Sequence, residues 1–428
     1  MNSPFLPVHF FRHEYGRLVA LLARRVGLQH LESVEDAVQV ALLAALETWV
    51  QSGAPDRPTA WLYRAARNQL MTDLRQSARR RELSAFWSAG ADILMEEASE
   101  PALQADMQDD LLRMLFACCD DSIPLESQLV FALKTLCGFE VREIAQRLFA
   151  SAASVYKRLQ RARDHLRAHA PDFSTWGPEL ISSRLPAVQC VLYLMFAEGH
   201  LSSHPQTPVR RELCDEAKRL TLLLAEHPLA GTPETFALMA LMHLHAARMA
   251  SRQHGGDVLL LLDEQDRSLW DRGEVAVGLS WLARSACGSK VSRYHAEAGI
   301  AAEHCLSPSL ARTRWDRVVE LYELLEQLAP SALHTLGKAL AVAELRGPAC
   351  GLAVLEGLRP HAELAGAYPW HAALADLHRR CGHVERARHH QDRAFAAAPS
   401  QPIADALRRR MLFTVAGSKA HRDERAVP

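Results

Sequence analysis

The sequence predicts an all-α protein. Apolar residues recur at helical spacing along nearly the whole chain, and alternating Val/Ile/Thr stretches of the kind that form strands are hard to find. A chain of 428 residues is long enough for about two to four domains. We therefore expect several helical modules joined by linkers.

The overall composition narrows the class of protein. The 49 Lys and Arg residues nearly balance the 50 Asp and Glu residues, so net charge alone indicates no nucleic-acid or membrane partner. Nine scattered cysteines without a CxxC pair favour a reducing cytoplasm over a disulfide scaffold. No apolar run approaches the roughly 18 residues that cross a bilayer, and no catalytic, phosphate-loop or metal-ligand pattern stands out. We expect a cytoplasmic protein without a membrane partner, cofactor, metal or enzymatic activity.

Abrupt changes in local charge divide the chain. Residues 57–81 contain seven Arg and one acid, whereas residues 82–110 contain eight acids and no Lys or Arg. An acidic block with interspersed Ser, Gly and Ala is typical of a linker, and prolines and a glycine near residue 175 mark a second boundary. The predicted organisation is a first module at 1–81, an acidic linker at 82–108, a second module at 109–170, a connector at 171–183, a helical array at 184–415 and a tail at 416–428.

The first module contains a basic helix, predicted to begin at Pro58 because proline is favoured in the first helical turn. At about 100° per residue, its apolar face collects Leu62, Tyr63, Ala66, Leu70 and Leu74. The opposite face collects Arg64, Asn68, Arg75 and Arg79, with Arg67 at its edge. Such a face is most often simply solvated. Its one-sided Arg content and the nearby Trp61 also suit binding to a phosphate backbone with an unpaired base stacked on the ring.

The second module has the pattern of a helix-turn-helix. A short helix at 141–148 is followed by a turn and by a basic helix from about Ala152, with Ser151 as its N-cap. The expected buried stripe is Val155, Leu159, Ala162 and Leu166. The outward face then carries Lys157, Gln160 and Arg161, flanked by Ser154, Tyr156 and Arg158. This geometry inserts into a DNA major groove, although a plain αα-hairpin with a basic exterior fits the pattern about equally well.

Three segments, 35–49, 58–75 and 141–163, match motifs that occur in this order in one protein family. The first, EDAVQVALLAALETW, follows the pattern EDAxQExFxxAxxxW, with Val40 and Leu42 where Glu and Phe are common. The chain resembles the extracytoplasmic-function (ECF) sigma factors of the sigma-70 family. In that family the three segments are the region 2 helix that docks on the RNA polymerase clamp, the promoter-melting helices, and the region 4 that binds the −35 element.

The resemblance implies an RNA polymerase sigma factor that binds the core enzyme and promoter DNA and directs promoter-specific initiation. The implied polymerase-binding residues are Asp36 and Gln39, on a helix whose expected buried stripe is Val38, Leu42 and Leu46. The implied −10 DNA-binding residues are Trp61, Arg64, Arg67, Asn68, Arg75 and Arg79. The implied −35 DNA-binding residues are Lys157, Gln160 and Arg161 on base edges, and Ser154, Arg158 and Arg163 on phosphates.

The remaining residues contain a repeat with a period of 34. Leu340 and Ala341 recur as Leu374 and Ala375, Ala353 recurs as Ala387, and Gly347 recurs one residue late as Gly382. Small packing residues at this period are typical of tetratricopeptide (TPR) repeats, which stack and leave a concave face for a partner. The extension also resembles that of the sigma-factor group with a C-terminal TPR-like domain, including FAEGH at 196–200 and LLDEQDRSLWDR at 261–272. We expect it to contact a protein, either another chain or the sigma modules of its own chain.

The acidic residues of the 261–272 segment fit no metal motif. Asp263, Glu264, Asp266 and Asp271 match neither an EF-hand loop nor a carboxylate–His pattern. Helix capping, or ion pairing with Arg267 and Arg272, is the better interpretation. The main alternative for the whole chain is a helical-repeat interaction scaffold without sigma activity, which would neither co-purify with polymerase nor confer promoter-specific transcription.

Overall fold

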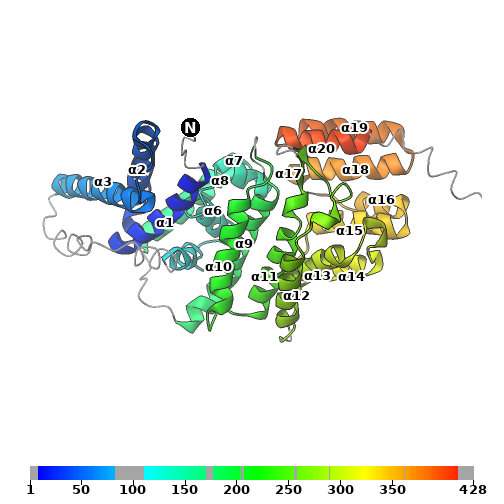
Figure 1. Ribbon diagram of the computed structural model, residues 1–428, viewed down its shortest axis with the longest axis horizontal. Helices are drawn as coiled ribbons and strands as arrows, with labels where there is room; N and C mark the ends of the chain where they lie inside the picture. The colour runs from blue at the N-terminus through cyan, green and yellow to red at the C-terminus, as the bar shows by residue number, and fades with distance from the viewer. Residues whose placement is uncertain are drawn as a thin grey trace, which may run out of the picture. The chain divides into compact units, whose positions relative to one another are not determined.

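A computed structural model describes most of the chain, namely residues 8–81, 110–169, 177–202, 204, 207–254, 258–288, 290–360 and 362–412. The chain forms two compact units, Met1–Leu192 and Tyr193–Pro428. Nearly all regular structure in the described residues is helical, apart from a short hairpin of β1 (Gln253–His254) and β2 (Val258–Leu259) (Figure 1). The predicted all-α class is confirmed. The acidic linker, the tail and residues 171–176 of the connector lie outside the described residues.

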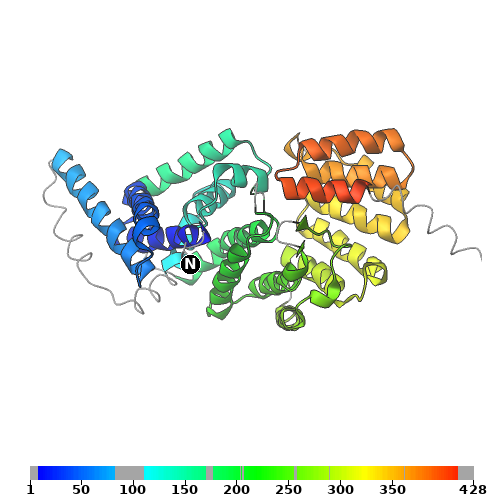
Figure 2. The ribbon, with the colours of Figure 1, turned by 45° about the horizontal axis from the view of Figure 1, so that its top comes forward.

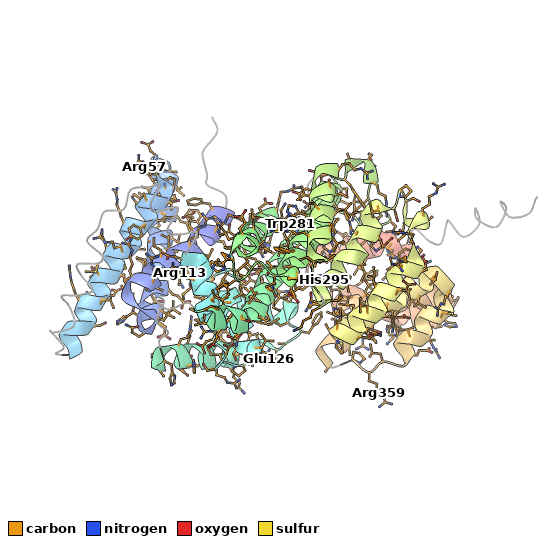
Figure 3. All side chains as sticks on the ribbon, turned by 90° about the horizontal axis from the view of Figure 1, so that it is seen from below. Arg57, Arg113, Glu126, Trp281, His295 and Arg359 are labelled. Atoms are coloured by element: carbon orange, nitrogen blue, oxygen red, sulfur yellow. The ribbon has the colours of Figure 1, made fainter. Side chains whose placement is uncertain are left out.

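The first unit is built from the helices of the two predicted modules and from the first part of a helix that begins in the predicted connector. They are α1 (Val8–Val26), η1 (Leu28–His30), α2 (Leu31–Ser52), α3 (Pro58–Arg81), a helical segment at 110–118, α6 (Leu125–Thr135), α7 (Val141–Arg147), α8 (Ala152–Ala168) and the first part of α9 (Pro178–His200) (Figure 2). Fully buried Leu21, Leu62 and Phe131 are among its core residues. Charged side chains such as Arg57 and Glu126 remain exposed (Figure 3).

Helix α1 lies against the segment that follows α6 with almost no space between the two backbones. A Cβ atom added at Gly16 would lie 1.9 Å from the carbonyl oxygen of Leu136. Close by in sequence, the Thr135 hydroxyl donates a 2.9 Å hydrogen bond to Glu35 of α2. Region 2-like and region 4-like residues, about 100 positions apart, therefore share one packed interface.

Helix α9 is long and apolar enough to cross a membrane by length and composition, but half of its most apolar window is buried within the structure. It also contains Arg184, whose side chain is 9% exposed, forms an ion pair with Asp120 and donates to the Phe116 carbonyl at 3.2 Å. A buried, paired arginine is typical of a core helix in a folded protein. The length of α9 is thus weak evidence for a membrane.

The second unit is a series of helices and short turns. They are the end of α9, α10 (Arg211–Glu226), α11 (Pro233–Ala246), η3 (Met249–Ser251), η4 (Arg267–Leu269), α12 (Arg272–Ser285), α13 (Arg293–Leu306), η5 (Leu310–Arg312), α14 (Trp315–Leu328), α15 (Ala332–Arg346), α16 (Pro348–Glu356), α17 (Ala362–Ala365), α18 (Tyr368–Arg380), α19 (Val384–Ala396) and α20 (Gln401–Leu412). Helices α11 and α12, α13 and α14, α15 and α16, and α18 and α19 pack in pairs.

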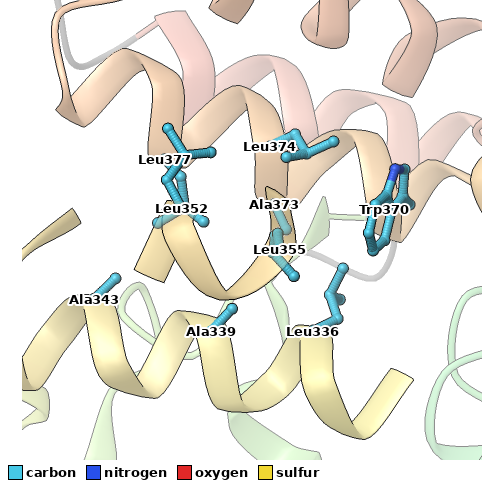
Figure 4. Close-up of a cluster of buried hydrophobic side chains, with 9 residues drawn as sticks. All are labelled: Leu336, Ala339, Ala343, Leu352, Leu355, Trp370, Ala373, Leu374 and Leu377. Atoms are coloured by element: carbon cyan, nitrogen blue, oxygen red, sulfur yellow. The ribbon is translucent and has the colours of Figure 1, made fainter. Parts of the chain in front are cut away.

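The 34-residue repeat corresponds in part to these pairs. Gly347 and Gly382 both adopt a positive φ, +94° and +81°, at the turns of the α15–α16 and α18–α19 pairs. One predicted equivalence is wrong, because Ala387 is buried whereas Ala353 is exposed. Gly351 takes the close-packing role instead, since a Cβ there would lie 2.5 Å from the Ala339 carbonyl oxygen. The core between these pairs contains Leu336, Ala339, Ala343, Leu352, Leu355, Trp370, Ala373, Leu374 and Leu377 (Figure 4).

Two of the four acidic residues of the 261–272 segment, Asp266 and Asp271, cap helices as expected, but the ion pairs predicted with Arg267 and Arg272 do not form among the described residues. Asp266 accepts from the Ser268 amide at 2.8 Å, and Asp271 accepts from the Gly273 and Glu274 amides at the start of α12. Arg267 donates to two backbone carbonyl oxygens, those of His304 and Ser307. The nearest basic partners of Asp263 and Glu264 are instead in α20: Arg410 and Arg409, each at 3.5 Å.

Candidate nucleic-acid interface

Helices α7 and α8 form the predicted helix-turn-helix. Glu140 and Glu143 make a capping box at the start of α7, and the Ser151 side chain accepts the Ser154 amide at 3.2 Å at the start of α8. Phe149, in the turn between them, adopts a φ of +47°, a left-handed conformation that usually favours glycine. Both caps satisfy amides that a helix start leaves without partners, so the turn and the direction of α8 are fixed locally.

The two faces of α8 are those predicted from its periodicity. Val155, Leu159, Ala162 and Leu166 are buried. Lys157, Gln160 and Arg161 are exposed, and Ser154 and Arg158 are half-buried beside them. Gln160 is held by a 2.8 Å hydrogen bond to Asp164, one turn further along the helix. The exposed face therefore presents cationic and amide donors in the arrangement that paired contacts to base edges require.

Arg163 points away from this face, toward α2. Its guanidinium donates to Glu35 at 2.6 Å, and Arg167 pairs with Glu32 of α2, also at 2.6 Å. Glu35 is only 4% exposed, and this burial raises its carboxyl pKa, while Arg163 and Thr135 act in the opposite direction. The side chain expected on a DNA phosphate is thus bound to a buried carboxylate in the structure.

The basic face of α3 is also where the sequence predicts it. Arg64, Asn68 and Arg75 are exposed, and Arg67 is half-buried, with a buried Nε atom that has no hydrogen-bond partner among the residues that the structure describes. Position 79 lies in α3, but its side chain is outside the described residues, so the Arg79 assignment stays a prediction. The opposite face contains the expected buried residues, except that Leu74 is half-buried.

Trp61 belongs to an aromatic cluster at the start of α3. Its ring packs edge-on against Trp49 of α2, with ring centroids 5.4 Å apart, and Trp49 in turn contacts Phe11 of α1 at 5.8 Å. The indole is half-buried. One side of Trp61 is therefore fixed by protein, which pre-orients the ring for a contact on its remaining exposed part.

Helix α2 differs from its prediction in one important respect. Asp36 and Gln39 are exposed as expected, but Leu46 of the predicted buried stripe is 45% exposed. The buried residues are mainly smaller ones, among them Ala37, Ala41 and Ala45, which allow close approach of neighbouring helices. The larger apolar residues form an exposed group that we call the α2 apolar surface: Val40, Leu43, Leu46 and Val50.

The sequence reasoning missed the α2 apolar surface because it assumed a single apolar stripe. The signal was present: from residue 37 to 46 this helix has apolar residues at every position except Gln39, more than one face can bury. Large apolar residues grouped on the outside of a folded unit indicate a surface that a partner covers.

Comparisons with known proteins agree with these features. Residues 11–80 match the model of sigma-70 region 2, residues 114–166 match that of sigma-70 region 4, and residues 184–286 match a family of unknown function (DUF6596). An uncharacterized protein of Rhizobium meliloti (strain 1021) is 32% identical over 382 residues, which cover 89% of each chain. No solved structure matches. Regions 2 and 4 in this order, with exposed basic faces on α3 and α8, show that the chain belongs to the sigma-70 family and is an ECF-type RNA polymerase sigma factor with a C-terminal extension.

Proposed function

We propose that this sigma factor binds core RNA polymerase through α2, the −10 element through α3 and the −35 element through α8. The observation that carries the proposal is the exposure of three groups of side chains in a single unit: an apolar group on α2 and basic groups on α3 and α8. Residues 1–81 and 109–170 are the two DNA-binding modules in this proposal, and residues 82–108 connect them.

Polymerase docking uses Asp36 and Gln39 together with the α2 apolar surface. Leu43 and Val50 are 60% and 59% exposed, so water contacts most of each side chain until a partner covers it. Burial of such side chains contributes about 1.5–3 kcal/mol each when it is complete. Asp36 and Gln39 would then set the orientation through polar contacts at the edge of the apolar surface.

The −10 contact uses Trp61, Arg64, Arg67, Asn68, Arg75 and Arg79. Exposed guanidinium groups along α3 neutralise phosphates, and the half-buried Trp61 ring offers a stacking surface for a base that has left the duplex. This helix therefore suits DNA whose strands are already separated.

The −35 contact uses the exposed face of α8 in the major groove. Lys157, Gln160 and Arg161 would contact base edges, while Ser154 and Arg158 at the margin of the face would contact phosphates. Arg163 joins the phosphate contacts once it has left Glu35. Sequence specificity thus depends on a few side chains of one helix.

The extension at 184–415 acts, in this proposal, by contacting a protein, either polymerase or the sigma modules of its own chain. Its paired helices with close-packed Gly and Ala positions support a TPR-like array, which presents a surface rather than a catalytic site. The chain has no enzymatic activity of its own in this view. It works in the cytoplasm, where polymerase and promoter DNA are, without a membrane partner.

Run-off transcription with reconstituted polymerase tests the proposal. The full chain, added to core enzyme and a library of promoter sequences, should produce transcripts from a restricted set with related −35 and −10 elements. Transcripts from no template, or equal transcription from all of them, would contradict it. Co-purification with core enzyme, measured in parallel, separates a failure of polymerase binding from a failure of promoter selection.

A further inference from the structure

The two segments that the sequence singled out in the extension, 196–200 and 261–272, meet at the same pair of buried arginines. Arg252 lies with its Nη1 atom 3.2 Å from the His200 ring, and Arg248 donates to the Gln265 side chain at 3.4 Å. Both arginines follow α11, on the turn that includes η3. Arg248 is 7% exposed and Arg252 is 8% exposed.

The contacts of these two guanidinium groups are uncharged. Arg248 lies over the Trp270 ring at 5.3 Å, besides its contact with Gln265, and Arg252 contacts a histidine ring. Among the described residues, neither has a carboxylate within ion-pair distance. Buried arginines elsewhere in the chain differ in this respect: Arg184 pairs with Asp120, and Arg210 lies 3.5 Å from Glu198.

The surroundings add to the positive charge instead of balancing it. Burial lowers the pKa of Arg248 and of Arg252 to about 10, so both stay charged at neutral pH. Burial and the adjacent arginines lower the pKa of His245 to about 3 and that of His304 to about 4, so both rings are neutral. An uncompensated buried charge is strongly unfavourable, and here two occur side by side.

Several buried polar atoms here also have no hydrogen-bond partner within the part of the chain that the structure describes. Three of them are donors, Arg252 Nε, Arg267 Nη2 and Trp270 Nε1, and the other two are the Nδ1 atoms of His245 and His304. Arg267 lies over the same Trp270 ring as Arg248, at 4.5 Å, and Arg248 is close enough to Arg252 to lower its pKa, so the three arginines form one cluster. Buried donors in folded proteins are almost always paired, which indicates that an acceptor belongs here.

We propose that the extension binds a phosphate group, as inorganic phosphate or as the phosphoryl group of a small molecule, at Arg248 and Arg252. A phosphate carries a charge of about −1.5 to −2 at pH 7 and three acceptor oxygens or more, which balances two guanidinium groups, whereas a carboxylate balances one. Guanidinium groups bind phosphate through two parallel hydrogen bonds. The small exposed fraction of both arginines excludes a nucleic-acid backbone or a peptide and suits a compact ligand.

Thermal unfolding of the full chain, followed by calorimetry, tests the proposal. Saturating sodium phosphate should raise the unfolding temperature of the second unit, Tyr193–Pro428, by about 4 °C or more. The reference is sodium chloride of equal ionic strength, and sodium acetate should not raise this temperature. Titration with inorganic phosphate and with glycerol 3-phosphate distinguishes the free anion from a phosphomonoester, because the compound that binds with the higher affinity identifies the ligand class. If neither compound changes the unfolding temperature more than chloride does, the proposal is wrong.

Arg248→Met and Arg252→Met provide the decisive variants, because Met fills a similar volume without charge. Each should unfold in phosphate-free buffer at a temperature equal to or above that of the parent chain, since an unpaired charge has been removed, and should lose the phosphate response. Arg210→Met is the matched control in the same unit, because Arg210 is 4% exposed and lies 3.5 Å from Glu198; it should lower stability while keeping the response. Phosphate stabilisation that persists in both site variants would show binding elsewhere, and a loss of stability as large as that of Arg210→Met would show that the chain itself balances these charges. Either result overturns the proposal.

Discussion

The guanidinium of Arg163 in α8 lies 2.6 Å from the carboxylate of Glu35 in α2, so a region 4 helix and a region 2 helix are joined by a partly buried ion pair. The −10 and −35 elements are separated by about 25 base pairs, or about 85 Å at 3.4 Å per base pair. A compact unit of this size is only about 40 Å across. In the proposed function, regions 2 and 4 therefore separate before both elements are bound, and the Glu35–Arg163 pair breaks.

Replacing Glu35 with Gln should favour that separation. The amide still accepts from Thr135 but no longer holds the Arg163 charge, so affinity for a −35 duplex should rise about fivefold, or about 1 kcal/mol. Fluorescence anisotropy with the full chain measures this affinity for the −35 duplex. Glu32→Gln, which removes only the exposed pair with Arg167, is the control and should change affinity little. Equal effects of the two variants would mean that the buried pair does not restrain region 4.

Arg161→Ala should weaken binding to one −35 base pair by about 1–3 kcal/mol because a base-edge hydrogen-bond pair is lost. Arg158→Ala should instead lower affinity for all sequences and reduce the salt slope by about one unit. Binding of each variant to duplexes with single −35 substitutions, at several salt concentrations, separates the two effects. If Arg158→Ala changed sequence preference and Arg161→Ala did not, the assignment of the α8 face would be reversed.

Asp36→Ala and Leu43→Ser should each reduce pull-down of core polymerase without loss of helical content. Both side chains are exposed on α2, and neither supports the core. Gln39 is a less suitable position because its side chain also hydrogen-bonds to the half-buried Tyr15. Glu126→Ala, an exposed acid on α6, is the matched control (Figure 3). Undiminished binding by both α2 variants would place the docking surface elsewhere.

The second unit should lose stability on acidification. His371 and His390 lie with their Nδ1 atoms 3.0 Å apart, and the His390 ring stacks on His378. Burial is the largest cause that lowers the pKa of all three histidines, and the neighbouring His and Arg side chains lower it further. The pKa of His390 falls to about 4. Below the usual pKa of about 6.5, the unfolded chain binds protons that the folded chain does not.

The free energy of unfolding should therefore fall from about pH 7 to about pH 4. Thermal unfolding of the full chain at a series of pH values measures this, and His390→Gln should reduce the slope. His169→Gln, at an exposed position of the first unit, is the control. It should leave the pH dependence of the unfolding of the second unit unchanged. A slope that is the same in the parent and in His390→Gln would exclude this cluster as its source.

A chain that ends at Leu192 should keep the fold of the first unit but transcribe at a changed rate. Arg184 and the first part of α9 belong to that unit, because Arg184 binds Asp120 and the Phe116 carbonyl, so a shorter chain ending near 170 would lose these contacts. Circular dichroism and run-off transcription measure the two properties. Transcription equal to that of the full chain, both in vitro and in cells, would show that the extension has no part in sigma activity.

The sequence predicted those elements in which one physical pattern dominates. The faces of α8 followed from apolar residues that recur every three or four positions between basic ones, and the start of α3 followed from Pro58. The phase of α2 could not be predicted in the same way because the helix is apolar on more than one side. The Glu35–Arg163 pair joins residues 128 positions apart, and the cluster at Arg248 and Arg252 assembles from distant turns, so neither has a local signal.

Gly16 gives the contact between regions 2 and 4 a steric basis as well as an electrostatic one. A single methyl group at that position would overlap the Leu136 carbonyl oxygen. Salt screens charges but leaves this fit of backbone against backbone intact. A side chain at position 16 would therefore act as a wedge, holding regions 2 and 4 apart while every residue that we propose to contact polymerase or promoter remains unaltered.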